Sequence, residues 1–267
     1  EKDRNVFLGA LSKELGKRKK ELLAANERDV AQARAGKLPE AFIQRLVLDA
    51  KGLRTLEAKL RGVQKLKSGL GEVIERRAER GGLLFDKVRT PLGVTLVIYE
   101  SRPEVTIDVA ALCIKSGNAA ILKGGSEARH TNHVLFRCIE AALRKSGLAK
   151  ETISYVEDRS AVKKLLKRHA HIDLVIARGG YGLVRTVQSE STIPVLSHAA
   201  GGARIYVDAS ADLKMAQKII QNAKVSKPAA CNSLDTIVVH AAVARRFVPR
   251  ITAALRAQGL RVLGDAA

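Results

Sequence analysis

The sharpest candidate for covalent chemistry is Cys231, which stands in the segment Lys227-Pro-Ala-Ala-Cys231-Asn232. A thiolate is a strong nucleophile, and positive charge nearby lowers the pKa of a cysteine thiol so that more thiolate forms. Lys224 and Lys227 supply such charge close by in the sequence. Cys231 is therefore a candidate nucleophile, with an inert buried thiol as the alternative.

Two glycine-containing turns have the residue types of nucleotide-binding loops. They are Lys123-Gly124-Gly125-Ser126 and Arg178-Gly179-Gly180. Each follows an expected strand and precedes an expected helix, whose first N–H groups have no partner within the helix and can bind a phosphate. These turns predict a dinucleotide site in which Lys123 reaches the adenosine ribose or its 2′-phosphate. A plain turn is the alternative for each.

A third polar turn, Glu100-Ser101-Arg102-Pro103, follows the apolar run 94–99. A guanidinium can hold a phosphate or a carboxylate bidentately, so Arg102, with Ser101 beside it, is a candidate for substrate binding. A salt bridge from Arg102 to Glu100 or Glu104 is the alternative. His130 and His133 have a spacing found in metal sites, but no set of thiols or carboxylates accompanies them, and we expect no metal.

These turns lie within an alternation of strands and helices. Apolar runs predict strands at residues 94–99, 119–122, 153–156, 172–176, 193–196, 204–207, 236–240 and 260–263. Helical periodicity is found from about residue 104 to 116 and at residues 127–146, 161–169, 181–188, 213–223 and 242–258. The alternation predicts a parallel, doubly wound sheet. Residues 1–37 and 38–66 are expected to be helical, and short strands and turns follow up to Pro91.

Composition narrows the class of protein. The chain has 267 residues, of which 46% are hydrophobic, and no apolar run approaches the roughly 20 residues that a membrane span needs. Its three cysteines, Cys113, Cys138 and Cys231, show no paired spacing, which favours a reducing compartment. We expect the cytoplasm, with the mitochondrion as the alternative.

The net charge of +20 is unusual, with 47 basic against 27 acidic residues. It is spread along the chain: residues 1–90 alone carry 22 Lys and Arg against 13 Asp and Glu. Such a field attracts polyanions, including RNA. Only nine aromatic residues and no Trp speak against stacking on bases, but phosphate contacts do not need them. An RNA partner is therefore an alternative to an anionic substrate and cofactor.

The segment ESRPEVTIDVAALCIKSGNAAILKGGSEA, with residues 174–180 and 227–236, resembles the gamma-glutamyl phosphate reductases (glutamate-5-semialdehyde dehydrogenases), a branch of the aldehyde dehydrogenase superfamily. The same module is the reductase half of pyrroline-5-carboxylate synthases. The resemblance is collinear over nearly the whole chain and implies an aldehyde-dehydrogenase-like α/β fold. It implies N-terminal helices and a dinucleotide-binding domain over residues 1–223. Residues 224–267 would begin a catalytic domain that continues further in the family.

The resemblance also implies an activity: NADPH-dependent reduction of gamma-glutamyl phosphate to glutamate-5-semialdehyde, in proline biosynthesis. Cys231 matches the family's catalytic cysteine, whose thiolate displaces phosphate to give a thioester that hydride then reduces. The Cys231 N–H and the Asn232 region would stabilise the oxyanion. For the full-length protein the family further implies a homo-oligomer.

The alternative is a non-catalytic member of this family that serves as a basic subunit of an RNA–protein assembly, for example a mitochondrial ribosome. It rests on the charge, on the shorter chain and on residues 197–204. Related reductases usually have an acidic residue near Ala200 and Cys-His where Ala203-Arg204 stand.

Overall fold

A computed structural model describes residues 1–197, 202–228, 230 and 232–265. The chain forms two compact units, Glu1–Ala199 and Ala200–Ala267. Cys231 lies outside the described residues, as do residues 198–201 of the loop that departs from the family's pattern.

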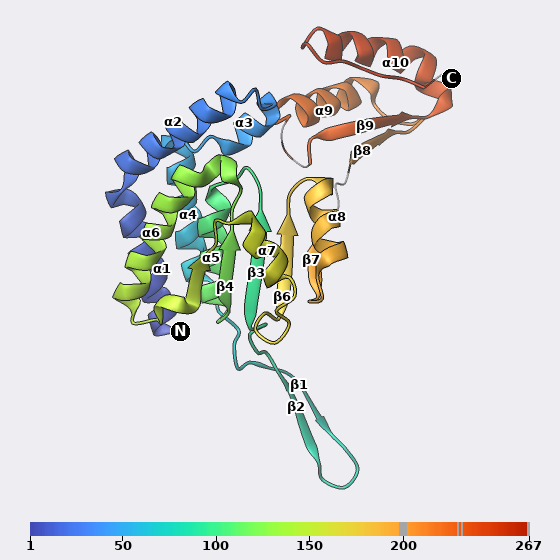
Figure 1. Cartoon of the computed structure of the whole chain (residues 1–267). Helices are drawn as coiled ribbons and strands as arrows, with labels where there is room; N and C mark the ends of the chain where they lie inside the picture. Colours follow the sequence, from blue (N-terminus) through green and yellow to red (C-terminus); the bar gives the residue numbers. More distant parts are fainter. Residues whose placement is uncertain (198–201, 229, 231, 266–267) are drawn as a thin grey trace. The chain divides into compact units, whose positions relative to one another are not determined.

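A five-stranded parallel sheet forms the centre of the first unit (Figure 1). Its strand order is β5-β4-β3-β6-β7. The bounds are β3 Val94–Tyr99, β4 Ala119–Lys123, β5 Ile153–Tyr155, β6 Leu174–Arg178 and β7 Val195–Ser197. The chain runs outward from the central β3 to β5 and then returns to β6 on the other side. The direction of winding therefore reverses between β3 and β6, and the parallel, doubly wound sheet predicted from the sequence is confirmed.

Helices cover both faces of this sheet. On one face, α5 (Glu104–Lys115) and α6 (Arg129–Ser146) pack on the sheet. The same core is completed by α1 (Lys2–Lys17), α2 (Lys19–Ala35) and α4 (Ala50–Lys65), which pack against these two helices. The other face packs on α7 (Arg159–Leu165) and α8 (Tyr181–Glu190). In β3, Val97 and Tyr99 enter the first core, whereas Leu96 and Ile98 enter the second. Because both faces are buried, the strand is a continuous apolar run in the sequence.

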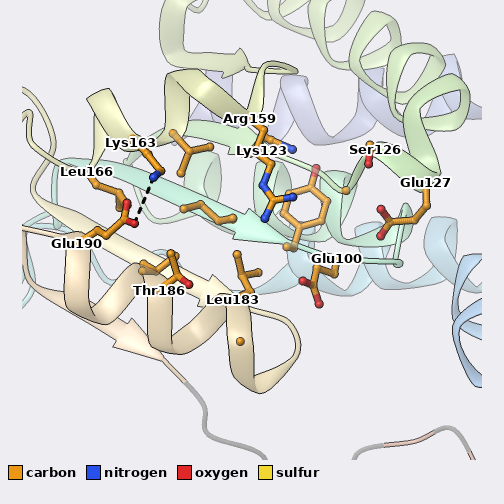
Figure 2. Close-up of a pocket in the computed structure, with 16 residues that line it drawn as sticks. Glu100, Lys123, Ser126, Glu127, Arg159, Lys163, Leu166, Leu183, Thr186 and Glu190 are labelled. Atoms are coloured by element: carbon orange, nitrogen blue, oxygen red, sulfur yellow. Dashed lines mark ion pairs between the residues drawn. The ribbon is translucent and has the colours of Figure 1, made fainter.

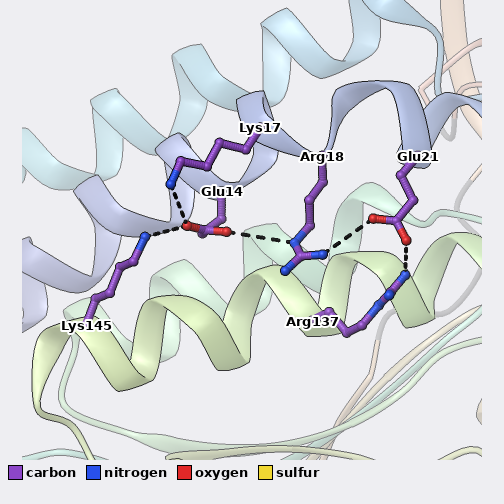
Figure 3. Close-up of polar contacts among 6 residues, drawn as sticks. All are labelled: Glu14, Lys17, Arg18, Glu21, Arg137 and Lys145. Carbon is purple, nitrogen blue, oxygen red and sulfur yellow. Dashed lines mark hydrogen bonds and ion pairs between the residues drawn. The ribbon is translucent and has the colours of Figure 1, made fainter.

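Each of the two helical stretches predicted at the N-terminus is divided in two. The first breaks at Arg18, between α1 and α2, and the second gives α3 (Glu40–Leu46) and α4. Figure 3 shows a polar network that joins the break to α6. The buried carboxylate of Glu14 pairs with Lys145, and Glu21 pairs with Arg137. This network fixes the first two helices to α6.

Between α4 and β3 the chain forms an exposed hairpin, which Figure 1 shows projecting away from the sheet. Its strands are β1 (Val73–Ala78) and β2 (Leu84–Val88), and every residue of both is exposed. Arg76 pairs with Asp86 across the hairpin at 2.6 Å. Two short 3₁₀ turns, η1 (Ser126–Ala128) and η2 (Lys150–Thr152), precede α6 and β5.

The second unit has its own small core. Strands β8 (Ala203–Val207) and β9 (Leu234–Val239) pair in parallel, and α9 (Leu213–Val225) and α10 (Ala241–Arg256) pack on them through Ile220, Phe247 and Ile251. Because β8 pairs with β9 and not with the five-stranded sheet, the units divide before β8, earlier than the expected boundary after Ala223. Where cofactor binding and catalysis divide stays a prediction.

The prediction of a strand at residues 260–263 was wrong. This segment is irregular, and none of the described strands pairs with it. Its apolar residues Leu260 and Val262 instead pack against the core of the second unit. An apolar run forms a strand only where a neighbouring strand accepts its backbone hydrogen bonds.

Candidate functional site

The carboxyl ends of three neighbouring strands bring the predicted turns to one edge of the sheet. Lys123 of β4 is the register partner of Ile98 in β3, and Arg178 of β6 is the partner of Tyr99. The turns that follow these strands therefore begin side by side. In sheets of this kind, ligands bind at this edge, where the direction of winding reverses.

A pocket of about 280 Å³ opens at this edge, between the strand ends and helices α7 and α8 (Figure 2). Its lining includes Tyr99, Glu100, Lys123, Gly125, Ser126, Glu127, Arg159, Lys163, Leu183 and Glu190. Gly124 lines an adjoining hollow that also contacts Gly125, Ser126 and Arg159. Small-molecule pockets in proteins commonly hold roughly 300–1,000 Å³, so this pocket suits part of a dinucleotide.

Lys123 is the buried cation of this pocket, with 8% of its surface exposed. Its Nζ donates a hydrogen bond to the carbonyl oxygen of Gly124 at 2.6 Å. Burial lowers the pKa of Lys123, and the positive charge of Arg159 lowers it further, whereas Glu127 acts in the opposite direction. Arg159, at the start of α7, is one of the charged residues of this site that the sequence analysis did not identify.

The carboxylates near Lys123 already have other partners. Glu157 pairs with Arg129 at 3.4 Å, and Asp158 caps α7 by accepting the first backbone hydrogen bond of the helix. Among the residues that the structure describes, no carboxylate forms an ion pair with Lys123 or Arg159. The pocket therefore holds two cations in proximity without paired counter-charges.

Ser101 is held by Glu127 from across the edge of the sheet. The N–H and the Oγ of Ser101 donate to Glu127 Oε1 at 2.6 and 2.9 Å. Ser101 is buried and has a φ of 45°, a conformation that a non-glycine residue adopts at a cost. Arg102 lies 3.8 Å from Glu104, the ion pair considered as its alternative. Neither Ser101 nor Arg102 lines the pocket, and their role in substrate binding stays a prediction.

The turn after β6 has an internal carboxylate as its partner. Glu100 Oε2 accepts a hydrogen bond from the N–H of Gly180 at 2.7 Å. The same oxygen explains why residue 179 is a glycine, since a Cβ at this position would lie 2.6 Å from Glu100 Oε2. The pyrophosphate role of Arg178, Gly179 and Gly180 stays a prediction, and it requires Glu100 to leave this N–H.

Two buried polar groups position the turn after β4. A Cβ on Gly124 would lie 2.3 Å from Asn132 Nδ2, and Asn132 Oδ1 in turn accepts from Thr106, so the backbone has no room to move on this side. Asp29 of α2 holds the start of α6. It accepts from both the N–H and the Oγ1 of Thr131, at 2.8 and 2.6 Å.

His130 and His133 belong to the packing of α6. His130 contacts Asp29 at 2.7 Å, and His133 contacts Glu157. In the described part of the chain, no three His, Cys, Asp or Glu side chains gather as metal ligands would.

Asn232 is exposed and directly precedes the segment that leads into β9. None of the described helices combines the length and apolar character that crossing a membrane requires.

Comparison with known proteins agrees with this architecture. The chain is 42% identical to the gamma-glutamyl phosphate reductase of Moorella thermoacetica, over 98% of the chain and 63% of the relative. The crystal structure of gamma-glutamyl phosphate reductase from Thermotoga maritima superimposes with a TM-score of 0.86 at 37% identity, covering 97% of this chain and 63% of that one. The enzyme of Saccharomyces cerevisiae gives a TM-score of 0.70 at 32% identity, covering 97% and 64%.

The chain thus spans about three fifths of the length of these relatives. The pattern of the aldehyde dehydrogenase family matches residues 4–265, which include both compact units. The match confirms the resemblance seen in the sequence. With the pocket at the carboxyl edge of a doubly wound sheet, it shows that the chain belongs to the aldehyde dehydrogenase family.

Proposed function

We propose that the protein reduces gamma-glutamyl phosphate to glutamate-5-semialdehyde with NADPH, in proline biosynthesis. The observation that carries the proposal is the pocket at the carboxyl edge of the sheet, where the buried Lys123 faces a space of the right kind for the adenosine end of a dinucleotide. The similarity to gamma-glutamyl phosphate reductases supplies the substrate.

The residues of the pocket fit the adenosine phosphate end of the cofactor. Lys123 supplies positive charge to the ribose or its 2′-phosphate, and the turn formed by Gly124, Gly125 and Ser126 lets the backbone approach. The turn Arg178-Gly179-Gly180 binds the pyrophosphate once Glu100 has moved away. When bound, NADPH supplies a hydride.

Cys231 carries the covalent step in this proposal. Its thiolate forms a bond to the acyl carbon of gamma-glutamyl phosphate, the bond from that carbon to the phosphate oxygen breaks, and inorganic phosphate leaves. The Cys231 N–H and Asn232 stabilise the oxyanion, while Arg102 and Ser101 hold the anionic substrate. After reduction of the thioester, the carbon–sulfur bond breaks to release the aldehyde and restore the thiolate.

The reverse reaction gives a direct assay: oxidation of glutamate-5-semialdehyde that requires both NADP⁺ and phosphate. We expect Cys231→Ala to abolish it and Cys113→Ala, at a buried thiol on α5, to retain it. Turnover that survives in Cys231→Ala, or the absence of phosphate-dependent turnover in the unmodified protein, contradicts the proposal. The homo-oligomer and the cytoplasmic location are further parts of the proposal, and light scattering and cell fractionation test them.

A second candidate is an RNA-associated role, favoured by the charge of the second unit. Residues 200–267 carry ten Lys and Arg against four Asp and Glu, and α10 contains arginines and no acidic residue. RNA binding that weakens steeply with salt, in a protein without reductase turnover, would support it. Weak binding at physiological salt would rule it out.

A further inference from the structure

Lys123 and Arg159 form an arrangement that calls for an anion. Both line the same pocket, and Figure 2 shows both side chains at its β4 end. Two cations in proximity repel one another, and burial makes the charge on Lys123 still more costly. The neighbouring Glu127, Glu157 and Asp158 are bonded elsewhere. An anion held between the two cations would remove both costs.

Lys163, the third cation of the pocket, differs from these two. It pairs with Glu190 at 3.6 Å on the other side of the pocket, as the dashed line in Figure 2 shows. Its charge is therefore already balanced within the chain. The unbalanced positive charge is concentrated at the β4 end, around Lys123 and Arg159.

This end of the pocket is where doubly wound folds place the adenosine ribose. In such folds a carboxylate near the strand end accepts a hydrogen bond from the ribose 2′-hydroxyl of NAD, whereas an arginine there accommodates the 2′-phosphate of NADP. A guanidinium suits this task because its parallel N–H groups match two phosphate oxygens. In this chain the position holds a lysine and an arginine, and the nearby carboxylates have other partners.

We propose that Arg159 is a specificity-determining residue that binds the 2′-phosphate of NADPH together with Lys123 and so makes the pocket prefer NADPH over NADH. The inference rests on the proposed cofactor site and adds the residue that selects between the two cofactors. Arg159 is exposed on the short helix α7, so its side chain is removable with little effect on the core.

The test is equilibrium binding of NADPH, NADH, 2′,5′-ADP and 5′-ADP to the purified protein, followed by ligand fluorescence or calorimetry. We expect Arg159→Ala to weaken binding of NADPH and 2′,5′-ADP on the order of 10- to 100-fold and to leave NADH and 5′-ADP within about 2-fold. Arg159→Lys retains part of the preference. Lys164→Ala, at an exposed neighbour on the same helix that does not line the pocket, leaves all four affinities unchanged.

The outcomes separate the inference from the proposed function. If Arg159→Ala weakens NADPH and NADH equally, Arg159 binds the pyrophosphate and the inference is wrong, although the cofactor site stands. If it changes neither affinity, the inference is also wrong. If the unmodified protein binds none of the four ligands, the proposed function and the inference fail together. Circular dichroism of each variant identifies any loss of fold.

Discussion

Glu100 and Gly180 share a hydrogen bond of 2.7 Å, in which the Glu100 carboxylate accepts from the backbone N–H that opens α8. The Gly180 N–H, at this edge of the sheet, is thus already hydrogen-bonded to an anionic side chain of the same protein. A cofactor phosphate and this carboxylate compete for the same donor.

Removing the negative charge of Glu100 should therefore strengthen cofactor binding. Hydrogen bonds to charged groups contribute about 1.5–3 kcal/mol, and a glutamine makes a weaker acceptor of similar shape. We expect Glu100→Gln to lower the Kd for NADPH by roughly 3- to 10-fold in a fluorescence titration. Glu104→Gln, at the first residue of α5 and outside the pocket, is the matched control. An unchanged or higher Kd in Glu100→Gln means that Glu100 does not compete with the cofactor.

The buried Lys123 predicts a pH dependence of cofactor affinity. Burial, and then the charge of Arg159, lower the pKa of Lys123, so it loses its proton at a lower pH than a free lysine does, against the pull of Glu127, Glu157 and Asp158. An anion binds more tightly to the protonated form. Affinity for NADPH should fall as pH rises from 7 through the lowered pKa, below the usual lysine value of about 10.4.

The control for this prediction is Lys123→Arg, because an arginine keeps its charge over the whole range. Its NADPH affinity should vary little between pH 7 and 10, whereas that of the unmodified protein should fall. Titrations at fixed ionic strength measure both curves. Parallel curves would show that another group causes the pH dependence.

Asp29 should be a main determinant of stability. Its side chain is 1% exposed and accepts hydrogen bonds from Thr131 and His130 at the start of α6. Asp29→Ala leaves these buried donors without an acceptor and should lower the free energy of unfolding by about 3 kcal/mol. Asp49→Ala removes an exposed cap of α4 and should cost only about 1 kcal/mol. Urea denaturation measures both, and equal effects would show that burial at Asp29 adds nothing.

Gly124 and Gly62 give a matched pair of glycine substitutions. A Cβ at Gly124 meets Asn132 at 2.3 Å, whereas one at Gly62, inside α4, meets nothing within 4 Å. We expect Gly124→Ala to destabilise the protein by about 1–3 kcal/mol and to weaken cofactor binding. Gly62→Ala should stabilise it by up to about 1 kcal/mol, through helix propensity. Thermal unfolding distinguishes the two, and a stable Gly124→Ala variant would contradict the tight packing described.

The central sheet was predictable because its strands are buried on both faces. Residues 94–99 form an apolar run bounded by polar turns, and a glycine or proline marks most element ends in this region. The same logic placed Lys123 and Gly125 at the sheet edge, where they line the pocket. Binding residues on strand-to-helix turns can be predicted from the sequence, because the fold class fixes the edge of the sheet at which such turns meet.

Three features were missed, for different reasons. Arg159 follows β5, which pairs in parallel with β4, so it reaches the same edge of the sheet, but its turn has no glycine of the kind that marked the other two turns. The break at Arg18 follows Gly16 by two residues, but the charged run from Lys17 to Lys20 continues the helical pattern, so a single helix was predicted there. The segment 204–207 has the pattern of one more strand of the main sheet, and only its pairing with β9 assigns it to the second unit.

The ion pair between Glu14 and Lys145 joins residues 131 positions apart. On the ribosome, at 5–20 residues per second, α1 therefore emerges roughly ten seconds before α6 exists to receive it. Leu8, Leu11 and Leu15, which are buried in the finished fold, lack the cover of α6 throughout that interval. The nascent chain thus offers an apolar helix before α6 has been made, the kind of segment that a chaperone at the exit tunnel shields until its partner arrives.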